Sequence, residues 1–137
     1  MSVKLLDVPV HKARILLVNT RKDALELVKG PFYADENERQ DSLQLMRKAV
    51  AISLESDGSV GWHLLYSRKK PQDIAHEAVH IGMMVLDNLG ITITPENDET
   101  LAYLVDHIVE AFYAREGWMA LDEFLTAEAP AKKAKRG

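Results

Sequence analysis

The sequence predicts an α+β domain, in which a small sheet packs against helices. Two short apolar runs, residues 49–55 and 60–66, flank an Asp57-Gly58 turn signal and predict an antiparallel hairpin. Two longer segments follow, each with apolar residues at helical spacing and a proline near its start, where a missing N–H is harmless. A chain of 137 residues has the usual size of one domain.

The elements before the hairpin are short. Residues 13–18 are apolar and β-rich, which predicts a buried strand. Residues 22–29 are helix formers and precede Gly30-Pro31, a typical helix stop. Residues 34–42 are acidic and aperiodic, so we expect a surface loop there. If residues 61–66 of the hairpin form an edge strand, an extended peptide can pair with it.

The helical half has clear boundary signals. Pro71 opens a helix that Gly90 closes, and Thr94 and Pro95 are the expected N-cap and first residue of a second helix that ends near Ala114. Residues 118–125 predict a last short helix. The buried stripe of the first long helix is expected to comprise Ile74, Ala78, Ile81, Val85 and Leu89.

Composition narrows the class of function. The chain has no cysteine, which excludes disulfides and thiolate metal sites, and its net charge of -4 argues against nucleic-acid binding. No apolar run is long enough to cross a membrane and no signal peptide is evident, so a cytoplasmic protein is expected. We assign residues 1–127 to one domain and residues 128–137 to a disordered basic tail.

The residues that carry chemistry form an H-E-x-x-H motif inside the first long helix. His76 and His80 stand one turn apart on one face, so both imidazoles can reach one metal ion, and Glu77 lies near enough to act on a water there. Without cysteine, a zinc ion must take histidine and carboxylate ligands. The alternative is a solvated helix face that carries two histidines by chance.

Catalytic zinc takes three protein ligands, so a third must come from another element. The second helix places Glu99, Tyr103, Asp106 and Glu110 close to one line, and Glu99, nineteen positions after His80, is the best-placed ligand. A simple helical hairpin brings Glu99 beside the late part of the first helix, so the two helices must cross at an angle. Tyr103 and His63 are candidate oxyanion stabilisers, although both also fit packing roles. Asp106 or Asp73 are candidates to orient a ligand imidazole.

Three stretches carry a resemblance to a known family: IAHEAVH (residues 74–80), LDNLGI (86–91) and NDETLAYL (97–104). They resemble the minimal zincin-like metallopeptidases of tailed bacteriophages and prophages, in a gluzincin arrangement. The resemblance implies a small twisted mixed sheet packed on the motif helix and on a second helix that supplies a glutamate. It also implies Zn²⁺ bound by His76, His80 and Glu99, with Glu77 as the general base. The resemblance covers the second half of the chain.

The sequence therefore predicts a zinc-dependent peptidase that hydrolyses a peptide or isopeptide bond in a protein or peptide substrate, in the host cytoplasm if the chain is phage-encoded. The alternative is a non-enzymatic phage assembly or binding protein that retains a zincin fold with a structural metal or none. Glu77 separates the two, because a structural site has no use for a carboxylate beside an open coordination position.

Overall fold

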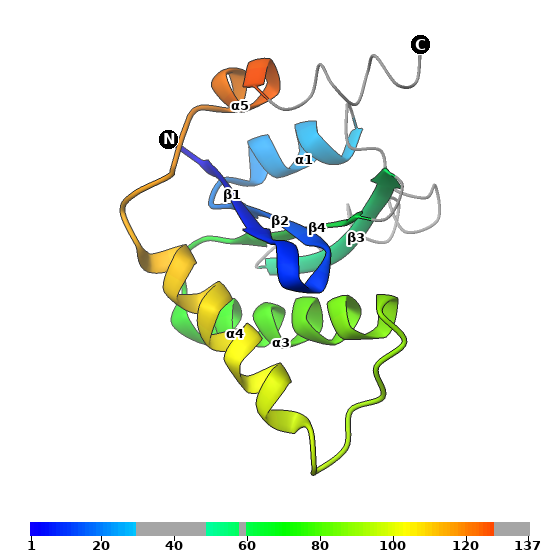
Figure 1. Cartoon of the computed structure of the whole chain (residues 1–137). Coiled ribbons are helices and arrows are strands. Elements are labelled where there is room, and N and C mark those ends of the chain that lie inside the picture. The colour runs from blue at the N-terminus through cyan, green and yellow to red at the C-terminus, as the bar shows by residue number, and fades with distance from the viewer. Residues whose placement is uncertain (30–48, 58–59, 128–137) are drawn as a thin grey trace.

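The computed structural model describes residues 1–29, 49–57 and 60–127, and its centre is a four-stranded sheet (Figure 1). The strand order is β1-β2-β4-β3; β2 and β4 are parallel, whereas the two outer pairs are antiparallel. The predicted α+β class with a small mixed sheet is confirmed. The strands are β1 (Val3–Val8), β2 (Ala13–Val18), β3 (Ala49–Asp57) and β4 (Val60–Ser67), with a short 3-10 turn η1 (Pro9–His11) between the first two.

Helices cover both faces of this sheet (Figure 1). On one face lie α1 (Arg21–Lys29) and α5 (Leu121–Ala127), and on the other α3 (Pro71–Asn88) and α4 (Asp98–Tyr113). Alternation along β4 separates the two cores: Leu64 packs towards α1, whereas Leu65 packs towards α3. Both faces of β4 are therefore buried.

The central position of β4 corrects one expectation. Peptide pairing with residues 61–66 required them to form an edge strand, but β4 pairs with β2 on one side and with β3 on the other. Its backbone groups are used within the sheet, so no peptide can add to it. The edges of the described sheet are β1 and β3. Strand β1 was missed, because residues 3–8 do not alternate cleanly between apolar and polar.

The helix boundaries agree with the sequence in α1 and α3 and differ in α4. Helix α4 begins at Asp98, with Asn97 as its N-cap residue, so the prediction of Thr94 and Pro95 was wrong. The Asn97 side chain explains the later start. It accepts a hydrogen bond from the Thr94 N–H at 2.7 Å and donates one to the Thr92 carbonyl at 2.8 Å, which ties residues 92–97 into a turn.

Two smaller expectations also change. Ile74, Ala78, Ile81 and Val85 are buried as predicted, but Leu89 is 37% exposed because α3 ends one residue earlier. The last helix begins at Leu121 rather than at residue 118, because Met119 pairs with Val3 as an isolated bridge. The predicted loop at 34–42, the Gly58-Ser59 turn and the tail at 128–137 lie outside the described residues.

Helices α3 and α4 meet where Gly82 faces α4. A Cβ atom at Gly82 would lie 2.7 Å from Leu101 Cδ1 and 3.6 Å from Val105 Cγ2, so the absence of a side chain lets the helices approach. At the far end of α4, Lys4 of β1 donates hydrogen bonds to the carbonyls of Ala111 and Ala114. These contacts fix the angle of α4 against α3 and the sheet. No helix in the described part of the chain combines the length and the apolar character needed to cross a bilayer.

Candidate metal centre

The two motif histidines lie on the outer side of α3, one turn apart. Their Nε2 atoms are 3.2 Å apart and their ring centroids 4.8 Å, with the rings inclined at 70°. Both side chains are exposed, whereas Ala78 between them is fully buried against the sheet. Because one side of α3 packs on the sheet, the opposite side, which carries the two imidazoles, faces solvent.

The separation of the two nitrogens tests whether these residues fit a metal. Two imidazole nitrogens bound to one tetrahedral zinc ion at about 2.0–2.1 Å lie roughly 3.3–3.4 Å apart. The observed 3.2 Å is close to this value, so the pair can bind one ion with little change of rotamer. The same distance also fits an N–H···N hydrogen bond when one ring donates. The two imidazoles therefore fit two of the ligand positions of one zinc ion.

Glu77 is the third member of this group. One ligand atom from each of His76, Glu77 and His80 lies within 4.8 Å of the others. Burial raises the pKa of the Glu77 carboxyl, and the charge of Asp73 raises it further, while His76 and His80 act in the opposite direction. A carboxylate with a raised pKa is a stronger base, which suits a group that accepts a proton from water.

Glu99, the predicted third ligand, is not a member of this group. It is exposed in the first turn of α4, two residues before Leu101, which packs on Gly82. Residues near Gly82 belong to the second half of α3, beyond both histidines. The structure thus brings together three of the four predicted residues of the metal centre, and the role of Glu99 stays a prediction.

Tyr103 lies on the outward side of α4, with 69% of its surface exposed. Glu99, Asp106 and Glu110 are exposed on the same helix, as the predicted line of polar residues requires. Opposite them, Leu104, Ile108 and Phe112 are buried in the core that α3 shares. The catalytic role of Tyr103 stays a prediction.

Comparison with known proteins gives no match. No protein-family model matches the chain, and no curated protein or solved structure shows significant similarity to it. The resemblance of residues 74–104 to phage zincins therefore stays a prediction, and a functional assignment rests on the geometry of α3.

His63 of β4 is a structural residue rather than a substrate contact. Its side chain has no exposed surface and lies under α3, where Nδ1 is 3.3 Å from Ser53 Oγ. The same hydroxyl lies 3.2 Å from the sulfur of Met84. Burial lowers the pKa of His63 to about 4, so the ring is neutral at physiological pH. A residue without exposed surface cannot stabilise an oxyanion on a substrate.

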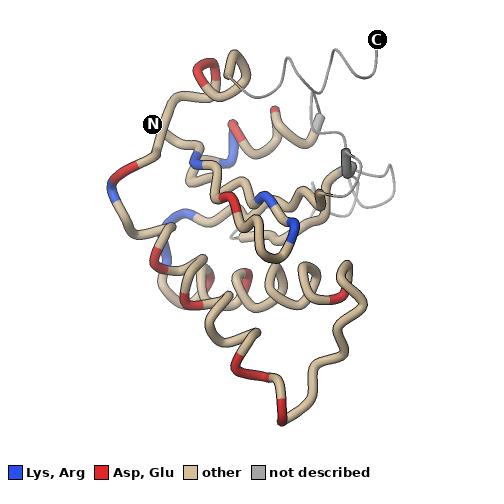
Figure 2. The backbone as a smooth tube through the Cα atoms, in the orientation of Figure 1, with Lys and Arg blue, Asp and Glu red and all other residues tan. Residues whose placement is uncertain are grey.

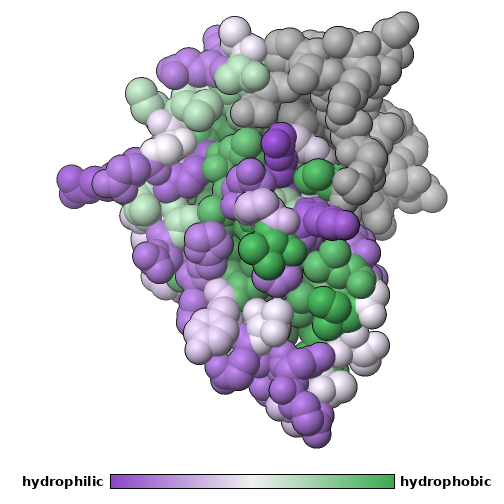
Figure 3. Space-filling view, viewed as in Figure 1, coloured by the Kyte–Doolittle hydropathy of each residue, from purple (hydrophilic) through white to green (hydrophobic). Residues whose placement is uncertain are grey.

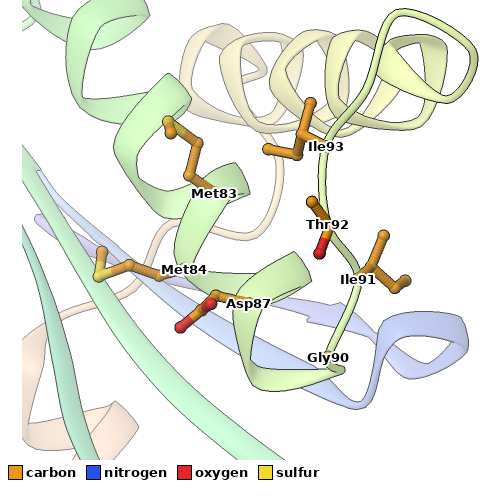
Figure 4. A pocket seen from close by; sticks show the side chains of 7 residues that line it. All are labelled: Met83, Met84, Asp87, Gly90, Ile91, Thr92 and Ile93. Atoms are coloured by element: carbon orange, nitrogen blue, oxygen red, sulfur yellow. The ribbon is translucent and has the colours of Figure 1, made fainter.

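An open groove beside the metal group was not foreseen from the sequence. It has a volume of about 560 Å³ and lies between the last turns of α3 and the connector to α4 (Figure 4). Apolar side chains also reach the surface in this part of the molecule, at the lower right of Figure 3. The apolar residues at 83, 89 and 91 are visible in the sequence, but their exposure is a property of the structure, and a linear pattern does not reveal that a connector folds back beside a helix.

Proposed function

We propose that this protein is a zinc-dependent hydrolase that cleaves a peptide or isopeptide bond. The observation that carries the proposal is the 3.2 Å separation of His76 Nε2 and His80 Nε2 beside a half-buried glutamate. Two imidazoles at ligand spacing and an adjacent half-buried carboxylate are parts that metal-assisted hydrolysis requires. Protein or peptide is the proposed partner class, and the cytoplasm is the proposed location, that of the host if the chain is phage-encoded.

Each residue has a distinct proposed role. His76 and His80 hold the ion through Nε2, and Glu99 of α4 is the proposed third ligand. When bound, Zn²⁺ acts as a Lewis acid that acidifies water and polarises the scissile carbonyl. Glu77 accepts the proton of the attacking water and delivers it to the leaving amine, while the C–N bond breaks and the C–O bond forms. Tyr103 is proposed as a hydrogen-bond donor to the oxyanion.

The recruitment of Glu99 requires a movement of the start of α4. The Glu99 side chain is exposed and forms no hydrogen bond or ion pair with another described residue, so it is free to change rotamer. It lies in the first turn of α4, immediately after a connector whose turn is held by Asn97. A shift of this turn towards α3 would close the site.

The first experiment is the metal content of the purified protein after zinc loading. We expect about one zinc per chain in the wild type, and loss of zinc in His76→Ala and in Glu99→Ala. Asp98→Ala is the matched control, because Asp98 is an exposed carboxylate in the same turn of α4. Absence of zinc from the wild type would overturn the proposal. Loss in His76→Ala but not in Glu99→Ala would keep the metal and reject Glu99 as its ligand.

One observation favours the second candidate, a non-enzymatic phage assembly or binding protein that retains a zincin fold. The described group consists of three residues of one helix turn, and Glu99 lies outside it. A zinc ion held without a third protein ligand is a poor catalyst, because its position is not fixed. Wild-type protein that binds zinc but cleaves no peptide, with Glu77→Gln indistinguishable from it, would favour this candidate.

A further inference from the structure

The groove beside α3 has a mostly apolar lining. Met83 and Met84 contribute from α3, and Ile91 and Ile93 from the connector, whose Ile93 side chain extends towards the helix (Figure 4). Methionine side chains are flexible and polarisable, so they adapt to apolar groups of different shape. A volume of about 560 Å³ is within the range of small-molecule and side-chain pockets. This lining favours an apolar side chain as the occupant.

The groove lies on the same helix as His76, Glu77 and His80, starting three residues after His80. Met83 follows His80 by three residues, which is about 5 Å along the helix axis. His80, Met83 and Asp87 are all exposed, and their i, i+3, i+7 spacing places them on one side of the helix. A peptide whose backbone passes the histidines can therefore place a neighbouring side chain in the groove.

Charge distinguishes the segment of α3, the connector and α4 from the rest of the chain. Residues 71–114 contain no lysine or arginine, although the whole chain has a net charge of only -4. Figure 2 shows acidic positions along α3, the connector and α4, and basic ones on the sheet side. The carboxylates of this segment are Asp73, Glu77, Asp87, Glu96, Asp98, Glu99, Asp106 and Glu110.

Apart from Glu77 and Glu99, which the proposed hydrolase uses, these carboxylates are available to a partner. None of them forms an ion pair with a described residue, and only Asp73 and Glu77 are half-buried. Asp87 belongs to the groove itself. A surface of one charge sign attracts partners of opposite charge and repels those of like charge. This raises the association rate of the matching partner and favours one orientation of it on the surface.

We propose that the groove binds an apolar side chain of a lysine- or arginine-rich peptide segment, and that such segments are the substrate class of this protein. The apolar lining selects the inserted side chain, and the carboxylates of α3 and α4 select its cationic neighbours. The substrate assignment rests on the proposed hydrolase function, whereas the binding itself does not.

Binding is tested by fluorescence anisotropy with labelled peptides and the full chain, without added metal. The probe is a short peptide with one leucine flanked by lysines; one comparison peptide has glycine for the leucine, and another has glutamate for the lysines. We expect the lysine–leucine peptide to bind at least about tenfold more tightly than either. Its affinity should fall with salt, because exposed charges are screened.

Variants locate the site. Ile93→Asp adds a negative charge to the groove, which by itself would favour the cationic probe. Weaker binding in this variant would therefore show that the apolar contact matters. Tyr113→Asp, with the same charge change at an exposed position of α4, is the control. Met83→Ala truncates the lining in a helix-compatible way and covers the case in which Ile93→Asp does not fold. Asp87→Lys should weaken binding about tenfold, whereas Asp122→Lys on α5 should not.

The results separate the two proposals. Equal binding of the lysine and glutamate peptides, or unchanged affinity in Ile93→Asp, Met83→Ala and Asp87→Lys, would overturn the groove assignment. Zinc binding and cleavage without preference for cationic peptides would keep the hydrolase and overturn this inference. Groove-dependent binding of cationic peptides by a protein that holds no zinc would support the groove and remove the hydrolase.

Discussion

Individual residues of α3 differ in function because of where they stand on the helix. His76 and His80 are exposed on the same side, Glu77 leans inward and is half-buried, and Ala78 is fully buried. This order follows from 3.6 residues per turn, which places successive residues about 100° apart. A carboxylate at the boundary of the core has a raised pKa, while its exposed neighbours remain free to bind a cation.

The proposed role of Glu77 as a base predicts a specific effect of Glu77→Gln. The amide has nearly the same shape but cannot accept the proton of the attacking water, so peptide hydrolysis should fall by about 10²- to 10⁴-fold. Zinc content should stay at the wild-type level, because Glu77 is not a proposed ligand. Steady-state cleavage assays beside metal analysis check both; undiminished cleavage would exclude Glu77 as the base.

His63 predicts a pH-dependent stability. Its folded pKa of about 4 lies below the ordinary value of 6.5, so the unfolded chain binds a proton more readily between these values. This contribution to stability is fully present above pH 6.5 and is lost as the pH falls towards 4, by about 3 kcal/mol. We expect His63→Leu to lose correspondingly less stability than the wild type over this range.

Urea unfolding at pH 7 and at pH 4 measures the difference. His107→Leu is the control, because His107 is exposed on α4 and its ring is not held by the core. An identical loss of stability in wild type and His63→Leu would contradict the assignment of His63 as a buried neutral ring.

Among the elements, the crossing of α3 and α4 depends on Gly82. Its missing side chain leaves room for Leu101, whose Cδ1 atom would lie 2.7 Å from a new Cβ. Because the end of the Leu101 side chain can move, Gly82→Ala should be nearly neutral, and it also gains helix propensity. Gly82→Leu must separate the helices and should lower the free energy of unfolding by about 2 kcal/mol. Denaturant titration of the two variants tests this contrast, which equal stabilities would refute.

The C-terminal end of α4 depends on a lysine from the opposite end of the chain. Lys4 is 6% exposed, donates to two carbonyls of α4 and lies 5.1 Å from the centre of the Trp118 ring. Burial lowers the pKa of its ammonium group, while Glu116 raises it. Lys4→Met keeps the volume but leaves these carbonyls without their cationic donor, so we expect a loss of about 2 kcal/mol. Lys22→Met, at an exposed position of α1, should change the free energy of unfolding little. An equal loss of stability in Lys22→Met would refute the specific role of the Lys4 contacts.

The proposed zinc ion should stabilise the molecule as a whole. A ligand that binds only the folded state, at a hundredfold excess over its dissociation constant, adds about 2.7 kcal/mol, or roughly 10 °C in Tm for a chain of this size. Thermal unfolding with zinc should show this increase, and a chelator should remove it. The Tm should not increase when zinc is added to His76→Ala or when magnesium is added to the wild type. A zinc effect that survives in His76→Ala would place the ion elsewhere.

The sequence by itself determined the class of the fold and the local part of the site. The hairpin, α1 and α3 follow from signals within a few residues: alternation in β3, the Asp57-Gly58 turn signal, helix formers in residues 22–29 and proline at residue 71. Such features depend on local backbone geometry, which a sequence pattern encodes directly. The start of α4 was predicted wrongly because a side chain, Asn97, competes with the helix for backbone groups.

Only the tertiary structure decided what long-range packing controls. The parallel pairing of β2 with β4 makes β4 central, buries His63 and removes the expected peptide-binding edge. Gly82 sets where α4 crosses α3, and therefore leaves Glu99 outside the group that His76, Glu77 and His80 form. These outcomes depend on contacts between residues far apart in the chain. The net free energy of such contacts is a small difference between the gain from burying apolar surface and the cost in conformational entropy. Local periodicity has no information about them.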